Sequence, residues 1–305
     1  MNPLREWTFR RWVSVKHRLM LAIELLGRSW RYLLLTAGFP LKKEFLVLRC
    51  IGGQAVSGLF SEFAAVLGAL DHYEKWQRLY AGLRVDFADQ GLYYEPAHGG
   101  NWWEYYFGRI DAGSERNAAT MIVSDRQHDI FAYRIARMSR KRGFELIGRY
   151  IRPQPHIREK VDAYVRGNFG DEFVIGVHYR GTDKWEDAPR ISYDDMYEAI
   201  QHVAESLASG RYKVFVATDE KAFLDYMVDR QPSGLLYREM FRSVDGRPID
   251  VVNEDGNYRK GEDAVMDCLL LSRCNYLIRS APNLSLCSTM FNPEVPELAL
   301  NHERK

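Results

Sequence analysis

Three short polar segments follow three apolar segments in the second half of the chain, and they hold side chains suited to chemistry. Each combines charged groups with hydroxyl groups, and the three are His178–Lys184, Thr218–Glu220 and Arg279–Ser285. A planar guanidinium such as that of Arg180 grips two phosphate oxygens at once, and backbone N–H groups at helix starts also bind anions. The pattern therefore predicts a site for a phosphate-bearing ligand.

Sequence patterns that are missing narrow the choice of ligand. The chain contains no Gly-x-x-x-x-Gly-Lys-Ser/Thr loop and no Gly-x-Gly-x-x-Gly after its first predicted strand, which disfavours ATPases and dinucleotide-dependent enzymes. It also contains no Asp-x-Asp pair, with which many sugar transferases hold a divalent ion on a diphosphate. A protein cation such as Arg180 would then have to neutralise a leaving diphosphate.

The elements that must position these segments alternate between strand and helix. The apolar pattern predicts strands at 173–177, 213–217 and 276–278 and helices at 193–207, 220–229 and 264–272. This alternation is typical of parallel βαβ units with crossovers of one hand. Ligands of open α/β sheets bind beyond the carboxyl ends of the strands, so we expect the three polar segments to lie together at that edge.

The first half of the chain predicts a second α/β layer. A buried strand is expected at 44–49, followed by the glycine pair Gly52-Gly53 and an apolar helix at 59–70. Residues 90–110 are aromatic and lack periodicity, which favours a long loop or short helix that lines a concave surface. A further helix, rich in arginine, is expected at 130–144.

Composition places the whole chain among globular proteins. It has 305 residues, of which 46% are hydrophobic and 27% charged, so it can bury a core and is too apolar for intrinsic disorder. Four cysteines without C-x-x-C spacing argue against a secreted disulfide framework or structural zinc. We expect Cys268, Cys274 and Cys287 to be buried small hydrophobic residues.

The net charge of +1 conceals a basic N-terminal arm. Residues 1–43 hold nine Lys/Arg and two Glu, a net charge of +7, so the rest of the chain carries −6. Trp7, Trp12 and Trp30 are interleaved with these cations, and the apolar run is shorter than the ~20 residues that cross a bilayer. The arm is typical of an amphipathic helix on an anionic membrane surface, with a solvated helix packed on the domain as the alternative. Nucleic acid is disfavoured because the main body is acidic and shows no nucleic-acid-binding motif.

The three polar segments also resemble the motifs of a known family. His178-Tyr-Arg-Gly-Thr-Asp183 resembles the first motif of the metal-independent fucosyltransferases, the group of the α1,6-, α1,2- and protein O-fucosyltransferases. The segment Ala217–Glu220 resembles their second motif, and Gly261–Ser272 together with Asn283-Leu284-Ser285 resembles their third. Within the group, Gly52-Gly53 and the aromatic segment Asn101–Phe107 are most similar to the rhizobial nodulation fucosyltransferase branch.

The resemblance covers residues 45–293 and implies a GT-B architecture, with two Rossmann-like α/β domains and the active site in the cleft. The C-terminal half would hold a GDP-sugar, and the N-terminal half would face the acceptor. Arg180 would bind the diphosphate and stabilise charge as GDP leaves. The other donor-binding residues that the resemblance implies are His178, Asp183, Asp219, Asp267, Asn283 and Ser285.

One departure from the family pattern leaves the donor open. Ala281-Pro282 stands where paired serines usually precede Asn-x-Ser, so two hydroxyl donors are missing. Either Ser280 and Ser288 substitute for them or the donor is bound differently. GDP-fucose is the expected donor, with another nucleotide sugar as the alternative.

Inversion at the sugar carbon normally needs a base that takes the acceptor proton. The candidates are Glu104, Glu95, His98, Asp183 and Glu186. We favour Glu104 as the catalytic base because it lies among aromatic residues that can stack on sugar rings. The remaining residues expected on the acceptor side are Gly52, Gly53, Trp102 and Trp103, with core packing as the alternative role of the tryptophans.

These patterns combine into a metal-independent, inverting glycosyltransferase of α/β, GT-B-like fold, with a glycan or glycolipid acceptor. We expect a basic amphipathic arm at 1–43, an acceptor-side domain at 44–155, ending near the break at Arg152–Pro155, and a nucleotide-sugar-binding domain at 156–305. No metal is expected, and the expected location is the cytoplasm, peripheral on the inner face of a membrane through the arm. The alternative from a different class is a non-catalytic membrane- or glycan-binding protein with a degenerate transferase fold.

Overall fold

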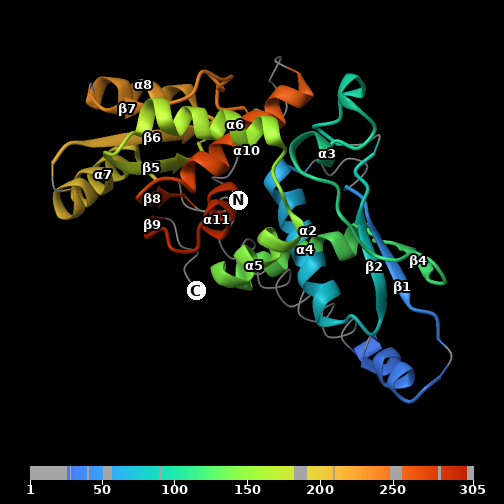
Figure 1. Cartoon of the computed structure of the whole chain (residues 1–305). Coiled ribbons are helices and arrows are strands. Elements are labelled where there is room, and N and C mark those ends of the chain that lie inside the picture. The colour runs from blue at the N-terminus through green and yellow to red at the C-terminus, as the bar shows by residue number, and fades with distance from the viewer. Residues whose placement is uncertain are drawn as a thin grey trace, which may run out of the picture. The chain divides into compact units, whose positions relative to one another are not determined.

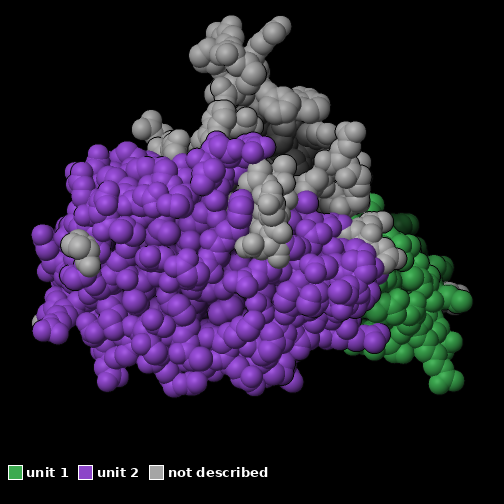
Figure 2. Space-filling view, turned by 90° about the horizontal axis from the view of Figure 1, so that it is seen from above, with its two compact units in different colours: residues 1–51, 63–86, 110–137 green, residues 52–62, 87–109, 138–305 purple. Residues whose placement is uncertain are grey.

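The structure of the chain is a computed structural model, which describes residues 26–27, 29–39, 41–50, 57–88, 91–181, 191–208, 210–231, 233–247, 256–280 and 283–300. The chain divides into two compact units (Figure 2): unit 1 is 1–51, 63–86 and 110–137, and unit 2 is 52–62, 87–109 and 138–305. Several residues of interest lie outside the described residues: the first 25 of the arm, Gly52, Gly53, Asp183, Glu186, Ala281 and Pro282. The division into an arm, an acceptor-side domain and a donor-binding domain stays a prediction.

Unit 2 is built on a five-stranded sheet in which all neighbouring strands are parallel (Figure 1). Its strands are β5 (Phe173–Tyr179), β6 (Tyr212–Thr218), β7 (Leu235–Leu236), β8 (Tyr276–Arg279) and β9 (Glu297–Ala299), in the order β7-β6-β5-β8-β9. This is the Rossmann order, 3-2-1-4-5, in which the direction of winding reverses between β5 and β8. The three strands predicted in this half are confirmed.

Helices cover both faces of this sheet (Figure 1). On one face, α7 (Tyr193–Leu207) and α8 (Lys221–Arg230) share a core with Ile175, Val177 and Tyr179 of β5. On the other face, α10 (Asn257–Leu271) ends so close to β5 that a Cβ at Gly176 would lie 3.2 Å from the Leu271 side chain. Since successive strand residues point to opposite faces, β5 is apolar at nearly every position because both faces are covered.

The other helices of unit 2 are η1 (Pro96–His98), α3 (Trp103–Tyr106), α5 (Arg140–Tyr150), α6 (Pro155–Tyr164), η3 (Val165–Phe169) and α11 (Asn283–Phe291). Helix α5 packs closely on α11, since a Cβ at Gly143 would lie 2.5 Å from Met290 Sδ. The described part of residues 90–110 consists of loop and the two short helices η1 and α3, which agrees with the predicted loop or short helix.

Unit 1 contains a four-stranded mixed sheet in the order β3-β2-β1-β4. Its strands are β1 (Glu44–Leu48), β2 (Tyr80–Val85), β3 (Asp111–Gly113) and β4 (Ala119–Ile122), with β3 antiparallel and the others parallel. Helix α2 (Leu59–Lys75), which belongs to unit 1 from Phe63 onward, confirms the apolar helix and extends it beyond the predicted end. Its Gly68 meets α4 (Asp125–Arg134), because a Cβ there would lie 2.1 Å from the Phe131 carbonyl oxygen.

The single helix expected at 130–144 is wrong. The segment is divided into α4, η2 (Ile135–Arg137) and α5. The reason is a second helix start at Ser139, whose Oγ accepts a hydrogen bond from the Arg142 N–H at 3.2 Å. The first N–H groups of a helix lack partners within the helix, and a serine N-cap accepts a hydrogen bond from one of them. The cap at Ser139 therefore marks the start of a new helix.

The four cysteines are buried and unbridged. Burial raises the pKa of the Cys268, Cys274 and Cys287 thiols, which keeps these three side chains protonated. Their predicted role as small hydrophobic residues is confirmed. In the ranges given above, no helix is both long enough and apolar enough to cross a membrane.

Candidate functional site

The backbone that leaves β5 is held between the ends of its two neighbouring strands. The Arg180 N–H donates to Ser280 Oγ at 3.2 Å, just after β8, and the Gly181 N–H donates to Asp219 Oδ1 at 3.0 Å, just after β6. Ser280 Oγ also donates to the His178 carbonyl oxygen at 3.2 Å. The three polar segments thus meet at the carboxyl edge of the sheet, where β5 and β8 form the switch point of the fold.

Arg180 presents a partly exposed cation at this switch point. Its Nε lies 3.1 Å from Asp219 Oδ2, and its side chain is 21% exposed whereas that of Asp219 is only 6% exposed. The guanidinium keeps its positive charge at any physiological pH. The carboxyl edge therefore carries a permanent cation that a ligand can reach, as an anion site requires.

A segment that follows β7 fixes the end of β6 from its other side. The Ser243 N–H donates to the Asp219 carbonyl oxygen at 2.8 Å, and the Lys221 N–H donates to the Ser243 carbonyl oxygen at 2.9 Å. Glu220 and Ser243 form a parallel bridge. Ser243 is 1% exposed, so this link lies in the interior and was not signalled by any motif in the sequence.

Helix α11 begins four residues after the end of β8, and its first turn contributes to the same edge. Asn283 begins this helix, and its Nδ2 donates to Ser61 Oγ at 3.2 Å. A helix start carries unpaired N–H groups and a partial positive charge, both of which favour an anion. Arg180 and the start of α11 thus provide two positive elements at the switch point.

The structure places Ser285 in the interior. Its side chain is fully buried and its hydroxyl donates to the Ser280 carbonyl oxygen at 3.2 Å. Ser288, proposed as a substitute donor, is also fully buried, and its hydroxyl donates to the Ser285 carbonyl oxygen at 2.7 Å. The Ser285 hydroxyl joins α11 to the residue after β8, and the Ser288 hydroxyl bonds within α11, so neither is presented to a ligand in this structure.

His178 lies in the interior close to two arginines. Burial first, and then the charges of Arg180 and Arg279, lower the pKa of His178 to about 3. The ring is therefore neutral, and its Nδ1 has no hydrogen-bond partner among the described residues. The role of His178 in donor binding, which the family resemblance implies, stays a prediction.

Asp267 is committed to a buried ion-pair cluster. Arg238, which follows β7, donates from Nη1 to Asp267 Oδ1 at 3.1 Å and from Nη2 to Asp263 Oδ1 at 2.5 Å. Burial lowers the pKa of Arg238, but the two carboxylates together outweigh burial and raise this pKa above its ordinary value. The cluster ties α10 to the segment after β7, so Asp267 is positioned as an internal link in this structure.

The tryptophans expected on the acceptor side are core residues here. Trp102 and Trp103 are each 1% exposed, and Trp103 Nε1 donates to the Gly108 carbonyl oxygen at 3.2 Å. The ring of Phe87 packs against both, at centroid distances of 4.9 and 5.9 Å. The structure therefore shows the packing role that was the alternative, and it presents neither ring to a sugar.

The candidate bases differ in what holds them. Glu104 is half-buried in α3, and its Oε1 accepts from Asn101 Nδ2 at 3.1 Å. Glu95 caps α10, since its Oε2 accepts from the Tyr258 N–H at 2.8 Å. His98 stacks on the Tyr258 ring at a centroid distance of 3.8 Å. Glu95 and His98 are thus engaged at the start of α10, while Glu104 binds one neutral amide through its carboxylate.

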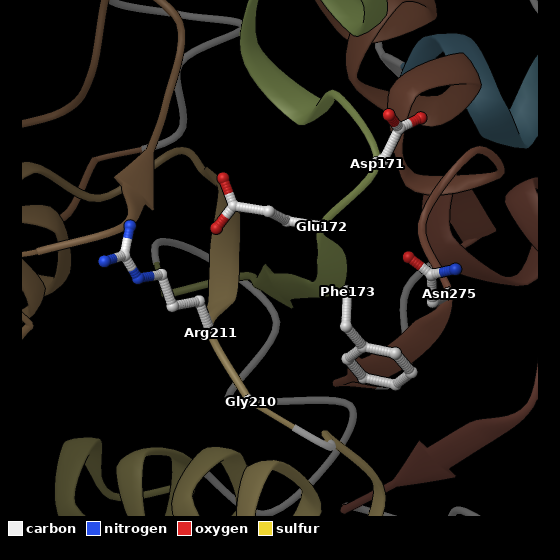
Figure 3. Close-up of a pocket in the computed structure, with 6 residues that line it drawn as sticks. All are labelled: Asp171, Glu172, Phe173, Gly210, Arg211 and Asn275. Atoms are coloured by element: carbon white, nitrogen blue, oxygen red, sulfur yellow. The ribbon is translucent and has the colours of Figure 1, made fainter.

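A separate hollow opens at the opposite edge of the unit 2 sheet. Figure 3 shows the residues that line this cavity of about 460 Å³: Asp171, Glu172, Phe173, Gly210, Arg211 and Asn275. They stand where β5, β6 and β8 begin. Ligands of parallel sheets bind at the other edge, so this cavity is not the candidate site. Among the described residues, no group of three or more His, Cys, Asp and Glu is placed to hold a metal ion.

Solved structures of similar shape support the fold. The crystal structure of "NodZ alpha-1,6-fucosyltransferase soaked with GDP-fucose" matches with a TM-score of 0.55 and 18% sequence identity, over 83% of this chain and 94% of that chain. The crystal structure of fucosyltransferase NodZ from Bradyrhizobium matches with a TM-score of 0.52 and 20% identity, over 84% and 94% of the two chains. The predicted α/β fold of the GT-B fucosyltransferases is confirmed.

Sequence comparison finds the same relatives. Nodulation protein Z of Bradyrhizobium diazoefficiens is 28% identical over 169 residues, which are 51% of this chain and 44% of that protein. The match thus spans less than half the length of this curated relative. The family model "Nodulation protein Z (NodZ)" matches residues 135–305, which include every described residue of the candidate site at the carboxyl edge except Ser61. The resemblance to the nodulation fucosyltransferase branch is confirmed, and the chain belongs to the NodZ family.

Proposed function

We propose that this chain is an inverting glycosyltransferase that transfers fucose from GDP-fucose to a glycan acceptor. The observation that carries the proposal is the position of Arg180, a partly exposed cation at the switch point of a Rossmann sheet. Membership of the NodZ family supports it, since structurally similar NodZ fucosyltransferases were crystallised with GDP and soaked with GDP-fucose.

The donor half of the mechanism follows from the charge at the carboxyl edge. The diphosphate would lie against the Arg180 guanidinium and the first turn of α11. The N–H groups at a helix start favour anions. When the bond between the sugar carbon and the diphosphate oxygen breaks, negative charge grows on GDP. Arg180 stabilises that charge without a metal ion, and such fixed groups stabilise developing charge most strongly in a water-poor site.

The acceptor half needs a base. A hydroxyl oxygen of the acceptor forms a bond to the sugar carbon from the face opposite GDP, which inverts the configuration, and its proton passes to a carboxylate. Glu104 remains our candidate because its carboxylate is not paired with a cation in the described contacts and contacts the Asn101 amide. Acceptor identity and linkage depend on loops rather than on this core.

Turnover of GDP-fucose tests the proposal. Purified protein with EDTA should release GDP from GDP-fucose in the presence of a mixed panel of glycan oligosaccharides, and Arg180→Ala should lose about 100-fold or more in kcat. Asp225→Asn is the matched control, because it removes an exposed charge from α8 that pairs only with Lys221 in the described contacts. Full activity in the Arg180→Ala protein would contradict the mechanism.

Competition between nucleotides tests the donor separately. The alternative donor is another nucleotide sugar, as the loss of two hydroxyl donors at Ala281-Pro282 permits. GDP should compete with GDP-fucose for the site, whereas UDP and dTDP should not. Stronger competition by UDP or dTDP would show that the donor is not GDP-fucose, without changing the conclusion about the fold.

We further propose that the arm holds the enzyme at an anionic membrane surface. The described part of the arm is helical at residues 26–27 and 29–36, where Leu26, Trp30 and Leu33 are 72%, 66% and 58% exposed. These positions follow a helical spacing and form one apolar stripe, next to a sequence with a net charge of +7. The opposite side carries Tyr32, which packs edge-on against Trp76 at 5.6 Å.

Vesicle binding tests this location. The protein should sediment with vesicles that contain phosphatidylglycerol more than with pure phosphatidylcholine, and Trp30→Ser with Leu33→Ser should lose that binding. Val244→Ser is the matched control, because Val244 is an 80% exposed apolar residue elsewhere. Equal sedimentation of the double variant and the unsubstituted protein would contradict the proposal.

A further inference from the structure

Three contacts of Asp219 join it to the segments that surround Arg180. Its Oδ1 accepts from the Gly181 N–H at 3.0 Å, and its Oδ2 lies 3.1 Å from Arg180 Nε. Its carbonyl oxygen accepts from the Ser243 N–H at 2.8 Å. The side chain is only 6% exposed, so its rotamer is fixed by packing, by the hydrogen bond on Oδ1 and by the ion pair on Oδ2.

These contacts limit how Arg180 can bind a ligand. Because Nε faces Asp219, a two-pronged grip on a phosphate group must use the two terminal nitrogens of the guanidinium. A free arginine side chain would lose about 2 kcal/mol of rotamer entropy on such binding. A carboxylate that already holds the side chain lowers this cost, which is the general advantage of preorganisation.

The same contacts argue against direct contact between Asp219 and a diphosphate. The carboxylate is negatively charged, and like charges at close range repel. Both of its oxygens already face donors on β5 and the residues that follow it. The family resemblance implied that Asp219 is a donor-binding residue, and the geometry favours positioning through Arg180.

We propose that Asp219 is a positioning residue that orients the Arg180 guanidinium toward the diphosphate of the donor. This role rests on the proposed function, because it needs a diphosphate ligand at the carboxyl edge. Ser280 supports the same unit from the other side by holding the Arg180 backbone. Arg180 is thus held at its backbone by Ser280, which follows β8, and at its side chain by Asp219, which follows β6.

The isosteric change Asp219→Asn keeps the size of the side chain and changes only its ability to orient the Arg180 guanidinium. An asparagine can still accept the Gly181 N–H through its amide oxygen, but its NH2 group would face Arg180 Nε, donor against donor. The guanidinium should then turn away while the chain keeps its fold. Asp225→Asn again serves as the control for loss of one carboxylate, since Asp225 is 56% exposed on α8.

A double-mutant cycle in GDP affinity, measured by calorimetry, is the test. Asp219→Asn should weaken GDP binding roughly tenfold, as for the loss of one hydrogen bond to a charged group. In the Arg180→Ala background the same change should have almost no effect, because the residue that it positions is gone. A merely structural role would weaken binding equally in both backgrounds.

A second variant keeps the test valid if Asp219→Asn folds poorly. Arg180→Lys keeps the charge but has no Nε–H for Asp219 to hold, and it leaves Asp219 unchanged. It should lose GDP affinity by roughly tenfold as well. Unchanged affinity in either folded variant would overturn the positioning role while leaving the proposed function intact. An unsubstituted protein that binds neither GDP nor GDP-fucose would overturn both.

Discussion

Two arginines follow strands of the same parallel sheet and have very different surroundings. Arg180 follows β5, faces the carboxylate of Asp219 and keeps 21% of its side chain exposed. Arg238 follows β7, faces the carboxylates of Asp263 and Asp267 and is only 10% exposed. The cation of Arg238 is held between two carboxylates inside the protein, whereas Arg180 pairs with Asp219 at a partly exposed position.

The difference shows how one residue type serves stability in one place and binding in another. A buried arginine with two carboxylates is needed to avoid uncompensated charges, so its removal should unfold the protein. A partly exposed arginine with one carboxylate is oriented but still accessible, so its removal should cost ligand affinity first. The following predictions test that contrast from the largest expected effect to the smallest.

Arg238→Ala should have the largest effect, and the effect should be on stability. Removing one partner of a buried pair typically costs about 3–5 kcal/mol, because the opposite charges stay buried without compensation. Urea unfolding should therefore show a strongly lowered midpoint for Arg238→Ala. A loss of unfolding free energy below about 1 kcal/mol is the size expected for an exposed ion pair. Such a result would mean that Arg238 is no more important for stability than a surface arginine.

Arg180→Ala should keep the fold and lose the ligand. We expect GDP affinity to fall roughly 10- to 100-fold, as for hydrogen bonds to charged groups, with a smaller loss of stability of about 1–2 kcal/mol. Calorimetric GDP titration and urea unfolding of the same sample check both values. A variant that unfolds as readily as Arg238→Ala while binding GDP normally would reverse the two roles.

His178, beside Arg180, should make stability fall in acid. The folded protein keeps this ring neutral with a pKa of about 3, whereas the unfolded chain takes up a proton near its ordinary pKa of 6.5. The unfolded state then binds more protons, so the contribution of this group is complete above pH ~6.5 and decreases as pH falls toward ~3. At pH 5 the loss should be about 2 kcal/mol.

The comparison for this third prediction is His178→Gln. The unfolding free energy of the unsubstituted protein should fall between pH 8 and pH 5 by about 2 kcal/mol more than that of the variant. Parallel urea titrations at the two pH values measure the difference. Identical pH dependence in the two proteins would mean that His178 is not held neutral by burial.

Arg211→Ala should have the smallest effect. Arg211 lines the hollow at the amino edge of the sheet (Figure 3), away from the ends of β5, β6 and β8 that meet at Arg180. An exposed surface substitution typically changes stability by less than about 0.5 kcal/mol, and GDP affinity should be unchanged. A loss of GDP affinity as large as that of Arg180→Ala would move the site to the amino edge.

The sequence was most informative where local pattern and global fold agree. Apolar runs alternating with helical spacing predicted β5, β6 and β8, and their parallel arrangement placed Arg180, Asp219 and Ser280 at one edge. The contacts between these residues confirm that placement. Short elements such as β7 were not predicted, because two residues carry no periodicity.

Burial was the harder property to predict from sequence. Ser285 and Trp102 belong to motif-like segments, yet the Ser285 hydroxyl bonds to the Ser280 carbonyl oxygen and the Trp102 indole packs on Phe87. The partner of a side chain depends on residues far away in sequence, as with Arg238 and Asp267. A motif gives the type of residue, whereas the fold decides whether that residue faces a ligand or the core.

Nucleotide-dependent thermal unfolding tests the central claim most directly, because a ligand that binds only the folded state raises the unfolding midpoint. The protein should be measured with GDP, GDP-fucose and UDP, each with manganese and with EDTA, beside Arg180→Ala. We predict a higher midpoint with GDP and GDP-fucose, unaffected by the metal or the chelator and lost in Arg180→Ala. A shift with UDP alone, or an equal GDP shift in Arg180→Ala, would contradict a GDP-sugar site built on Arg180.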